Sequence, residues 1–484
     1  MSDYKYSYKY ELEQQTPMLH FQFTSLKKPE NHSIPNNEEI GGCLRASEVK
    51  PKLDKFMLQW LLNHKIEIPK SWYVDPCNID DSPAFKYKLR FIINKTPTYI
   101  KPHKLFFGNL QNPKNDKKTF VNAIFYRDCI IEMEIMCFCT DTIHYNTNEK
   151  IPLPLINDNN QEIKITKISL PDIIDIVLPH FFRMNAFGAR SGKGFGCFKL
   201  IKQLTEYKTA FTEFCPVHYE VSYHKIINYN DVLNDIWFLS SMMKGGFNFT
   251  LTSPNDKNTG QKNFKEQKND YYKGFILRKY WEINPLKFKV VNEKAFIKKY
   301  ILPSRRNESF GSNELIEEKT DIPDPSNCRF VRAMLGLPGN YAYHAKNNGK
   351  DGEHNTKRAG TVNVTHNESD KNKKPIIQRF ASPVLYRLED SVLYIIPATI
   401  NEKIYGTSFI MCNAIGGQSK IIYTPHKDEF CLINFLDKFM EELKDPIVRA
   451  GLKDFDNKYV KNSSFCKDLS LSITKIEGAN IVDG

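Results

Sequence analysis

Apolar and polar residues alternate over 85–91, where four large apolar side chains are separated by three cations. This period of two predicts a strand with one buried face and one outer face. The outer row comprises Lys86, Lys88 and Arg90, which is typical of a solvated face and less often of a groove for nucleic acid. Similar signals predict further strands over 18–23, 120–126, 130–138, 163–168, 197–201 and 217–224.

Helical spacing separates these strands. Ser47 is an expected N-cap, and the apolar residues after it recur on one helical face as far as Leu61. Ser169 is a second expected N-cap, before an apolar helix that leads toward residue 187. Further helices are predicted from residue 230 to the Gly245-Gly246 stop and over 429–443.

The order strand, helix, several strands, helix, strand is typical of a ferredoxin-like or RRM-like α+β unit. The pattern completes one cycle and then begins a second at residue 217. We therefore expect an α+β fold with two such domains, at 1–216 and 217–484. Polar stretches near 253–270 and 345–374 interrupt the second domain, and we expect both to be exposed or disordered insertions. The second insertion is expected to be dispensable for folding.

Length and charge narrow the class of protein. The 484 residues suffice for two domains, and 68 Lys and Arg against 56 Asp and Glu give a net charge of +12. This moderate basic excess favours a polyanion partner, nucleic acid first. The 11 cysteines form no C-x-x-C pair, and no apolar run is long enough to span a bilayer. We expect reduced thiols, a cytoplasmic protein, and neither a metal site nor a cofactor.

The most informative segment is the glycine-rich stretch 187–198, which follows the second predicted helix. It contains Gly188, Gly192, Gly194 and Gly196, interleaved with Arg190, Ser191 and Lys193. Glycine lets the backbone approach a ligand closely and adopt positive φ, and cations with free N–H groups attract anions. The segment therefore predicts a cradle for phosphate groups.

Two common motifs fit this stretch poorly. A Walker A loop needs four residues between its first glycine and the Gly-Lys pair, whereas Gly188 and Gly192 enclose three, and Lys193 is followed by Gly194. Residues 193–196 match the opening of an RNP1 motif, but Cys197 stands where an aromatic residue is required. Nucleotide hydrolysis is disfavoured.

The segment Gly188-Ala189-Arg190-Ser191-Gly192-Lys193-Gly194-Phe195-Gly196 resembles the glycine-rich loop of the RAMP superfamily of CRISPR proteins. Three other segments support the resemblance: 42–50 is similar to the G-x-x-(I/L)-R-G element, 332–338 to R-x-x-L-G-L-P, and 379–385 to R-x-x-S-P-L. The pattern is most similar to the first RAMP subunit of type III-B effectors, the Cmr complexes. In those proteins the loop carries a paired Arg-Arg where this chain has Gly192-Lys193.

The resemblance implies a non-catalytic subunit of a guide-RNA ribonucleoprotein, placed toward the 3′ end of the guide, that helps to capture target RNA in antiviral defence. Its expected partners are guide RNA, target RNA and other RAMP subunits. The implied RNA-binding residues are Arg45, Lys50, Lys52, Gly188, Arg190, Ser191, Gly192, Lys193, Gly194, Phe195, Gly196, Arg329, Arg332 and Arg379. Each Arg outside the loop is equally compatible with an ion pair at the edge of a core.

The alternative is a RAMP endoribonuclease that processes guide-RNA precursors with a histidine as general acid or base. His20 and His180 are the histidines near the relevant segments. A single histidine in an apolar stretch is more often structural. The binding function is therefore preferred, with no catalytic residue.

Overall fold

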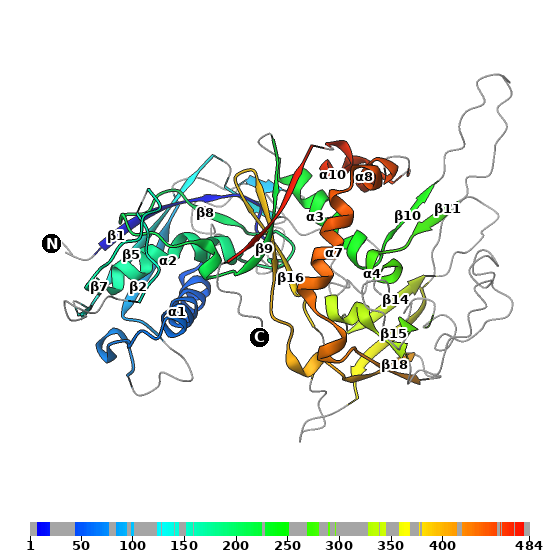
Figure 1. The fold of residues 1–484 in the computed structure, drawn as a ribbon, viewed down its shortest axis with the longest axis horizontal. Helices are drawn as coiled ribbons and strands as arrows, with labels where there is room; N and C mark the ends of the chain where they lie inside the picture. The colour runs from blue at the N-terminus through cyan, green and yellow to red at the C-terminus, as the bar shows by residue number, and fades with distance from the viewer. Residues whose placement is uncertain are drawn as a thin grey trace, which may run out of the picture. The chain divides into compact units, whose positions relative to one another are not determined.

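The structure is a computed structural model that describes residues 7–19, 44–76, 84–93, 98–100, 123–126, 128–139, 141–144, 152–157, 159–224, 228–250, 269–279, 289–290, 296, 328–337, 339–344, 358–367, 377, 380–413, 419–452, 455, 457–468 and 470–478 (Figure 1). The chain forms two compact units. Unit 1 comprises Met1–Ile236, Leu385–Ile396 and Leu471–Gly484, and unit 2 comprises Trp237–Val384 and Pro397–Ser470. Helices and mainly antiparallel sheets occur in both units, so the predicted α+β class is confirmed.

Unit 1 begins with a four-stranded antiparallel sheet in the order β2-β5-β1-β8. Its strands are β1 (Ser7–Gln14), β2 (Tyr87–Ile92), β5 (Ile130–Cys137) and β8 (Phe198–Leu200). Helix α1 (Ala46–Asn63) connects β1 toward β2, and α2 (Leu170–Met184) connects β5 toward β8. The two helices cover one face of the sheet and enclose a core with it (Figure 1).

The strand β1 was not among the predicted strands, although it alternates in the same way. Its inward residues Tyr10 and Leu12 are buried, whereas Lys9, Glu11 and Glu13 are exposed. The strand expected at 18–23 is different: Met18 and Leu19 form single bridges with Ile124 and Ala189, and 20–23 lie outside the described residues.

Local signals explain both helices. Ser169 is the N-cap of α2, as predicted from the sequence, and it forms a capping box with Asp172; α2 continues through Pro179 to Met184. The N-cap of α1 is Arg45 and not the expected Ser47. Buried residues recur along α1 at helical spacing, including Leu53, Met57, Trp60 and Leu61.

A second four-stranded sheet of unit 1 gathers distant parts of the chain in the order β16-β17-β9-β20. These strands are β9 (Val217–Ser222), β16 (Val384–Glu389), β17 (Val392–Pro397) and β20 (Ser472–Glu477). β9 pairs antiparallel with both β17 and β20. Helix α3 (Tyr229–Met243) follows β9, and α7 (Leu432–Lys444) comes between β17 and β20 in the chain.

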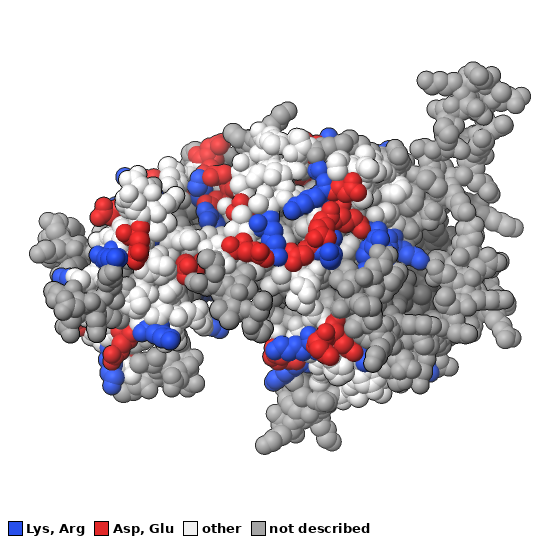
Figure 2. Space-filling view, viewed as in Figure 1, with Lys and Arg blue, Asp and Glu red and all other residues white. Residues whose placement is uncertain are grey.

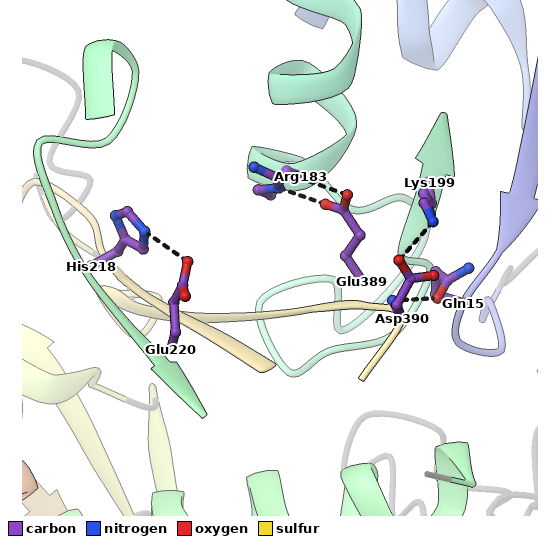
Figure 3. Close-up of polar contacts among 7 residues, drawn as sticks. All are labelled: Gln15, Arg183, Lys199, His218, Glu220, Glu389 and Asp390. Carbon is purple, nitrogen blue, oxygen red and sulfur yellow. Dashed lines mark hydrogen bonds and ion pairs between the residues drawn. The ribbon is translucent and has the colours of Figure 1, made fainter. Parts of the chain in front are cut away.

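The turn between β16 and β17 is bonded to the first sheet and to α2. Glu389 accepts two hydrogen bonds from the Arg183 guanidinium, at 2.5 and 2.8 Å (Figure 3). Asp390 lies 2.6 Å from the Lys199 ammonium, and its backbone N–H donates to Gln15. A hairpin from the second half of the sequence therefore fastens to elements of the first half.

Short strand pairs complete unit 1: β3 (Thr98–Ile100) pairs with β4 (Ala123–Phe125), and β6 (Thr142–His144) pairs with β7 (Lys167–Ser169). Unit 2 contains a six-stranded sheet in the order β12-β13-β19-β18-β15-β14. The strands are β12 (Lys289–Val290), β13 (Cys328–Arg329), β14 (Asn340–His344), β15 (Arg358–His366), β18 (Ser408–Asn413) and β19 (Ser419–Tyr423). β10 (Phe247–Thr250) pairs with β11 (Asn269–Tyr272), and the short helices are α4 (Phe275–Arg278), α8 (Pro446–Leu452), α9 (Lys458–Asn462) and α10 (Ser464–Lys467).

The expectation of a disordered insertion over 345–374 is wrong for Arg358–His366. This segment is the interior strand β15, which pairs with β14 on one side and β18 on the other. Val362 and Val364 are buried in the core of that sheet. The strand was not predicted because long polar segments lie on either side of its short alternating pattern. Of the other expected insertion, 253–270, only Asn269 and Asp270 are described, and they belong to β11.

The uncovered face of the first sheet carries paired charges. The Lys9 ammonium lies 3.1 Å from Glu132, and Arg90 donates to Glu134. Hydrogen bonds from Ser7 and Arg90 lower the pKa of Glu134. Charges of both signs also lie side by side on the molecular face drawn in Figure 2. Lys88 and Arg90 of β2 are exposed and Arg90 is ion-paired, which agrees with a solvated face, the commoner of the two interpretations.

The position of β15 generates a stability prediction. Val362→Asp buries an unpaired carboxylate and should lower the free energy of unfolding by at least about 2 kcal/mol. The control is Asn363→Asp, which introduces the same residue one position along, on the half-buried opposite face of the strand. Thermal unfolding of the two variants checks the prediction, and equal melting temperatures would contradict the place of β15 in the core.

Candidate nucleic-acid interface

The glycine loop, residues 185–197, connects α2 to β8 and is held by main-chain hydrogen bonds. The N–H of Phe187 donates to the carbonyl of Gly196 across the neck of the loop, at 3.0 Å. Ala189 donates to Leu19 at 2.7 Å, and Gly196 donates to Pro17 at 2.9 Å. The loop therefore has a fixed shape, set largely by the segment that follows β1.

Three loop glycines are required by the protein's own packing. Gly188, Gly194 and Gly196 have φ of 79°, 78° and 70°. A Cβ atom at Gly188 would lie 2.5 Å from the Leu19 carbonyl oxygen, and one at Gly196 would lie 2.0 Å from the Phe187 carbonyl oxygen. At Gly194 it would lie 2.3 Å from the Ile236 side chain. The protein's own packing therefore accounts for these three glycines without a ligand, and Phe195 is likewise buried.

The tip of the loop is a turn formed by Arg190, Ser191, Gly192 and Lys193, in which the Lys193 N–H donates to the Arg190 carbonyl at 2.7 Å. Arg190 is exposed and has a φ of 59°. A Cβ at Gly192 would contact only the Leu385 side chain, at 3.4 Å, so a ligand can approach the backbone at this glycine. Residues 190–193 are therefore the part of the loop that can contact a ligand.

Two cations lie together in this turn. Burial lowers the pKa of Lys193 to about 8, and the positive charge of Arg190 adds to the effect. Partial desolvation of the guanidinium also lowers the pKa of Arg190, although the residue as a whole is exposed. Like charges in a partly desolvated site are unfavourable in the free protein, and a bound anion relieves that repulsion.

The first turn of α1 lies beside the loop. One Glu48 carboxylate oxygen accepts hydrogen bonds from the Gly188 N–H at 3.0 Å and from the Lys52 ammonium at 3.2 Å. The Lys52 ammonium also lies 4.7 Å from the centre of the Phe187 ring. Arg45, the N-cap of α1, precedes Glu48 by three residues and is half-buried. The structure thus brings the predicted residues Arg45 and Lys52 to the α1 end that meets the loop.

Lys50 points elsewhere. Its ammonium lies 2.6 Å from Asp54, donates to the Phe85 carbonyl at 3.0 Å, and lies 4.2 Å from the centre of the Tyr87 ring. These contacts occupy the Lys50 side chain between α1 and β2.

The three arginines predicted in the second half of the chain differ in their surroundings. The Arg329 guanidinium pairs with Glu429, with N···O distances of 3.0 and 3.4 Å. Arg332 is half-buried, with one nitrogen 3.5 Å from the position of a Cβ on Gly245. Arg379 lies outside the described residues. The two motifs that contain Arg332 and Arg379 are joined by a reciprocal pair of hydrogen bonds between Leu337 and Phe380.

The described residues give no support to a histidine as the general acid or base of the nuclease alternative. His180 is buried and its ring stacks on Phe211 and Phe214. Burial lowers the pKa of His180 to about 3, so this ring is neutral at pH 7 and a poor proton donor. His20 lies outside the described residues. No cluster of potential metal ligands occurs in the described part of the chain.

Sequence reasoning missed one residue at this site. Arg387 of β16 is buried, and its guanidinium donates to the carbonyl of Ser191 at 2.8 Å. An arginine between the apolar residues of 384–388 is an unusual feature that the sequence displays. Its partner is 196 positions away in the chain, so the sequence could not identify the contact.

Comparison with known families gives two matches that together cover most of the chain. Residues 5–247 match the model of the Cmr1 N-terminal domain, and residues 271–462 match the model of the Cmr1 C-terminal domain. These matches define a RAMP subunit of a type III-B CRISPR effector. The chain belongs to the Cmr1 family, the first RAMP subunit of the Cmr complex. No curated protein and no solved structure gives a match to it. No helix in the described ranges is long and apolar enough to cross a membrane.

The glycine geometry generates a matched pair of substitutions. Gly196→Ala combines a positive φ with a backbone collision and should lower the free energy of unfolding by about 2 kcal/mol or more. Gly192→Ala should change it by less than about 0.5 kcal/mol, because the site has room. Thermal unfolding measures both, and a similar loss at Gly192 would show that the loop tip is packed.

Proposed function

We propose that this chain is a non-catalytic RNA-binding subunit of a type III-B Cmr ribonucleoprotein, acting in the cytoplasm. The turn 190–193 and the start of α1 contact the sugar-phosphate backbone of guide or target RNA near the 3′ end of the guide. This contact helps the assembled complex to capture target RNA. Membership of the Cmr1 family supports the assignment to a multisubunit complex.

The observation that carries the proposal is the pair of cations in one tight turn. Arg190 and Lys193 stand close enough for Arg190 to depress the Lys193 pKa, and the intervening Gly192 leaves the backbone uncovered. Cations and N–H groups recognise phosphate without reading bases. An RNA backbone meets both requirements because it presents a phosphate at every nucleotide.

The sheet face used by RRM-type binders is less suited to this role. RRM domains stack bases on aromatic side chains of the central strands. Here the central strands β1 and β5 present Lys9, Glu132 and Glu134 on that face, and each is ion-paired. This arrangement favours the loop over the sheet as the RNA contact.

The topology supports two ferredoxin-like RAMP modules. In the first, the chain order β1-α1-β2-β5-α2-β8 gives the sheet order β2-β5-β1-β8. In the second, the core elements β9, α3, β16, β17, α7 and β20 follow in chain order, and the sheet order is β16-β17-β9-β20. Both are the order of a β-α-β-β-α-β unit with strand four beside strand one. The second module would then begin at β9, and the six-stranded sheet would be inserted between its α3 and β16.

Loop charge is expected to govern RNA affinity. Arg190→Ala and Lys193→Ala should each weaken binding to RNAs of unrelated sequence to a similar extent. Each lost phosphate contact should reduce the slope of log K against log salt by about 0.7 for a single strand. Fluorescence anisotropy with labelled single-stranded RNA over a salt series measures both quantities.

Lys9→Ala is the matched control, because it removes the same charge from the ion-paired face of the sheet. Its affinity should remain near that of the wild type. An equal loss in all three variants would show that net charge alone attracts the RNA, and an effect on one RNA sequence only would contradict a backbone contact.

The lowered pKa of Lys193 gives a pH dependence. Below about pH 8 the ammonium is charged and can bind phosphate, and above it the group becomes neutral, so RNA affinity should fall as pH rises from 7 to about 9. Lys193→Arg should bind with little change over this range, because its guanidinium stays charged. A wild-type affinity with the same pH profile as Lys193→Arg would contradict the assignment.

The lowered pKa of Lys193 also affects the stability of the fold, and there the charged form of the side chain is unfavourable. The unfolded chain holds the Lys193 proton to a higher pH than the folded chain, so burial of the charge destabilises the fold at neutral pH. Lys193→Met should therefore unfold at a higher temperature than the wild type at pH 7 while it binds RNA more weakly. A lower melting temperature would show that the ammonium stabilises the free protein.

A further inference from the structure

Arg387 lies in β16, far along the chain from the glycine loop, yet it is bonded to the loop backbone. The side chain is buried, with 5% of its surface exposed. Its guanidinium donates to three carbonyl oxygens: Met184 at 2.9 Å, Ser191 at 2.8 Å and Tyr386 at 2.7 Å. Met184 is the last residue of α2, where a cation is favoured by the helix dipole. Arg387 thus joins the end of α2 to the tip of the loop.

The bond to Ser191 fixes the orientation of the next peptide group. The peptide between Ser191 and Gly192 is trans, so its carbonyl and its N–H point in opposite directions. Because the carbonyl points at the buried Arg387, the Gly192 N–H points away from it. Within the described residues this N–H has no hydrogen-bond partner. It is a fixed donor beside Arg190 and Lys193.

Neighbouring contacts hold β16 against the loop. Tyr386 forms a parallel bridge with Lys193, and the Leu385 side chain lies 3.4 Å from the position of a Cβ on Gly192. The following turn is tied down by the Arg183–Glu389 and Lys199–Asp390 pairs (Figure 3). These contacts fix the position of β16 and therefore the position of Arg387.

We propose that Arg387 is a positioning residue for RNA binding, which aims the Gly192 N–H at an RNA phosphate held between Arg190 and Lys193. This inference rests on the proposed function of the loop. It makes RNA binding by the first module depend on a strand of the second module. A single phosphate oxygen would accept from the Gly192 N–H while the two side chains neutralise its charge.

Arginine suits this role better than lysine. Its planar fork reaches carbonyls on α2, the loop and β16 at once, whereas the lysine ammonium is a point charge on a flexible four-carbon stem. Arg387→Lys keeps the charge and loses the fork, and Arg387→Met loses both. If Arg387 acted only through its charge, Lys would restore affinity.

The experiment measures RNA affinity and melting temperature for the full-length wild type, Arg387→Lys and Arg387→Met with labelled single-stranded RNA. Loss of one charge-assisted hydrogen bond should lower affinity about tenfold in both variants. Combining Arg387→Lys with Arg190→Ala should give a loss smaller than the product of the two single losses, because both act on one phosphate. Wild-type affinity in Arg387→Lys, or independent losses, would overturn the proposal.

Arg278→Met is the control for a general effect on stability, because it breaks the ion pair with Glu442 within unit 2, whereas the loop and Arg387 belong to unit 1. It should lower the melting temperature and leave RNA affinity within about twofold, since the Arg387 contacts remain. If affinity follows melting temperature across Arg278→Met and the Arg387 variants, Arg387 has no specific role at the loop.

Hydrogen–deuterium exchange on the wild type tests the proposal without a variant. RNA should slow exchange in the peptide that covers 190–193, where the Gly192 amide has no hydrogen-bond partner among the described residues. If the wild type binds RNA but exchange at 190–193 does not change, the proposal for Arg387 fails. If the wild type does not bind RNA at all, the proposed function of the loop fails instead.

Discussion

The main-chain hydrogen bonds of the glycine loop are the constraint on which the candidate interface depends. A loop that passes through a core must satisfy its buried N–H and carbonyl groups. This loop does so with Pro17, Leu19 and Arg387 as partners, which come from the segment after β1 and from β16. Its glycines permit these close approaches, and one short turn with two cations lies at the tip of the loop.

Local sequence signals predicted much of this arrangement. The cap at Ser169, the apolar faces of α1 and α2 and the position of the loop each depend on residues close together in the chain. The strand β1 was not predicted, because Lys9, Glu11 and Glu13 alternate with its apolar residues and make the segment polar on average. β15 was hidden by polar neighbours on both sides, although Val362 and Val364 alternate with polar residues.

At the site, the sequence could not predict the contacts between residues that are far apart in the chain. The sequence indicated that the loop is rich in glycine. Only the structure shows that the other glycines of the loop are needed for packing, whereas Gly192 has room for a side chain. Lys50 and Lys52 are two residues apart and face different partners, Asp54 and Glu48. The Arg387 bond links residues 196 positions apart, and no local pattern contains that information.

The most direct test of the central claim is a cryo-EM structure of the assembled Cmr complex with guide and target RNA. The account predicts an RNA phosphate within hydrogen-bonding distance of the Gly192 N–H, with Arg190 and Lys193 on either side. It also predicts that the Lys9–Glu132 and Arg90–Glu134 pairs stay intact on the open face of the first sheet. RNA bases stacked across that sheet face, with the turn 190–193 free of RNA, would contradict it.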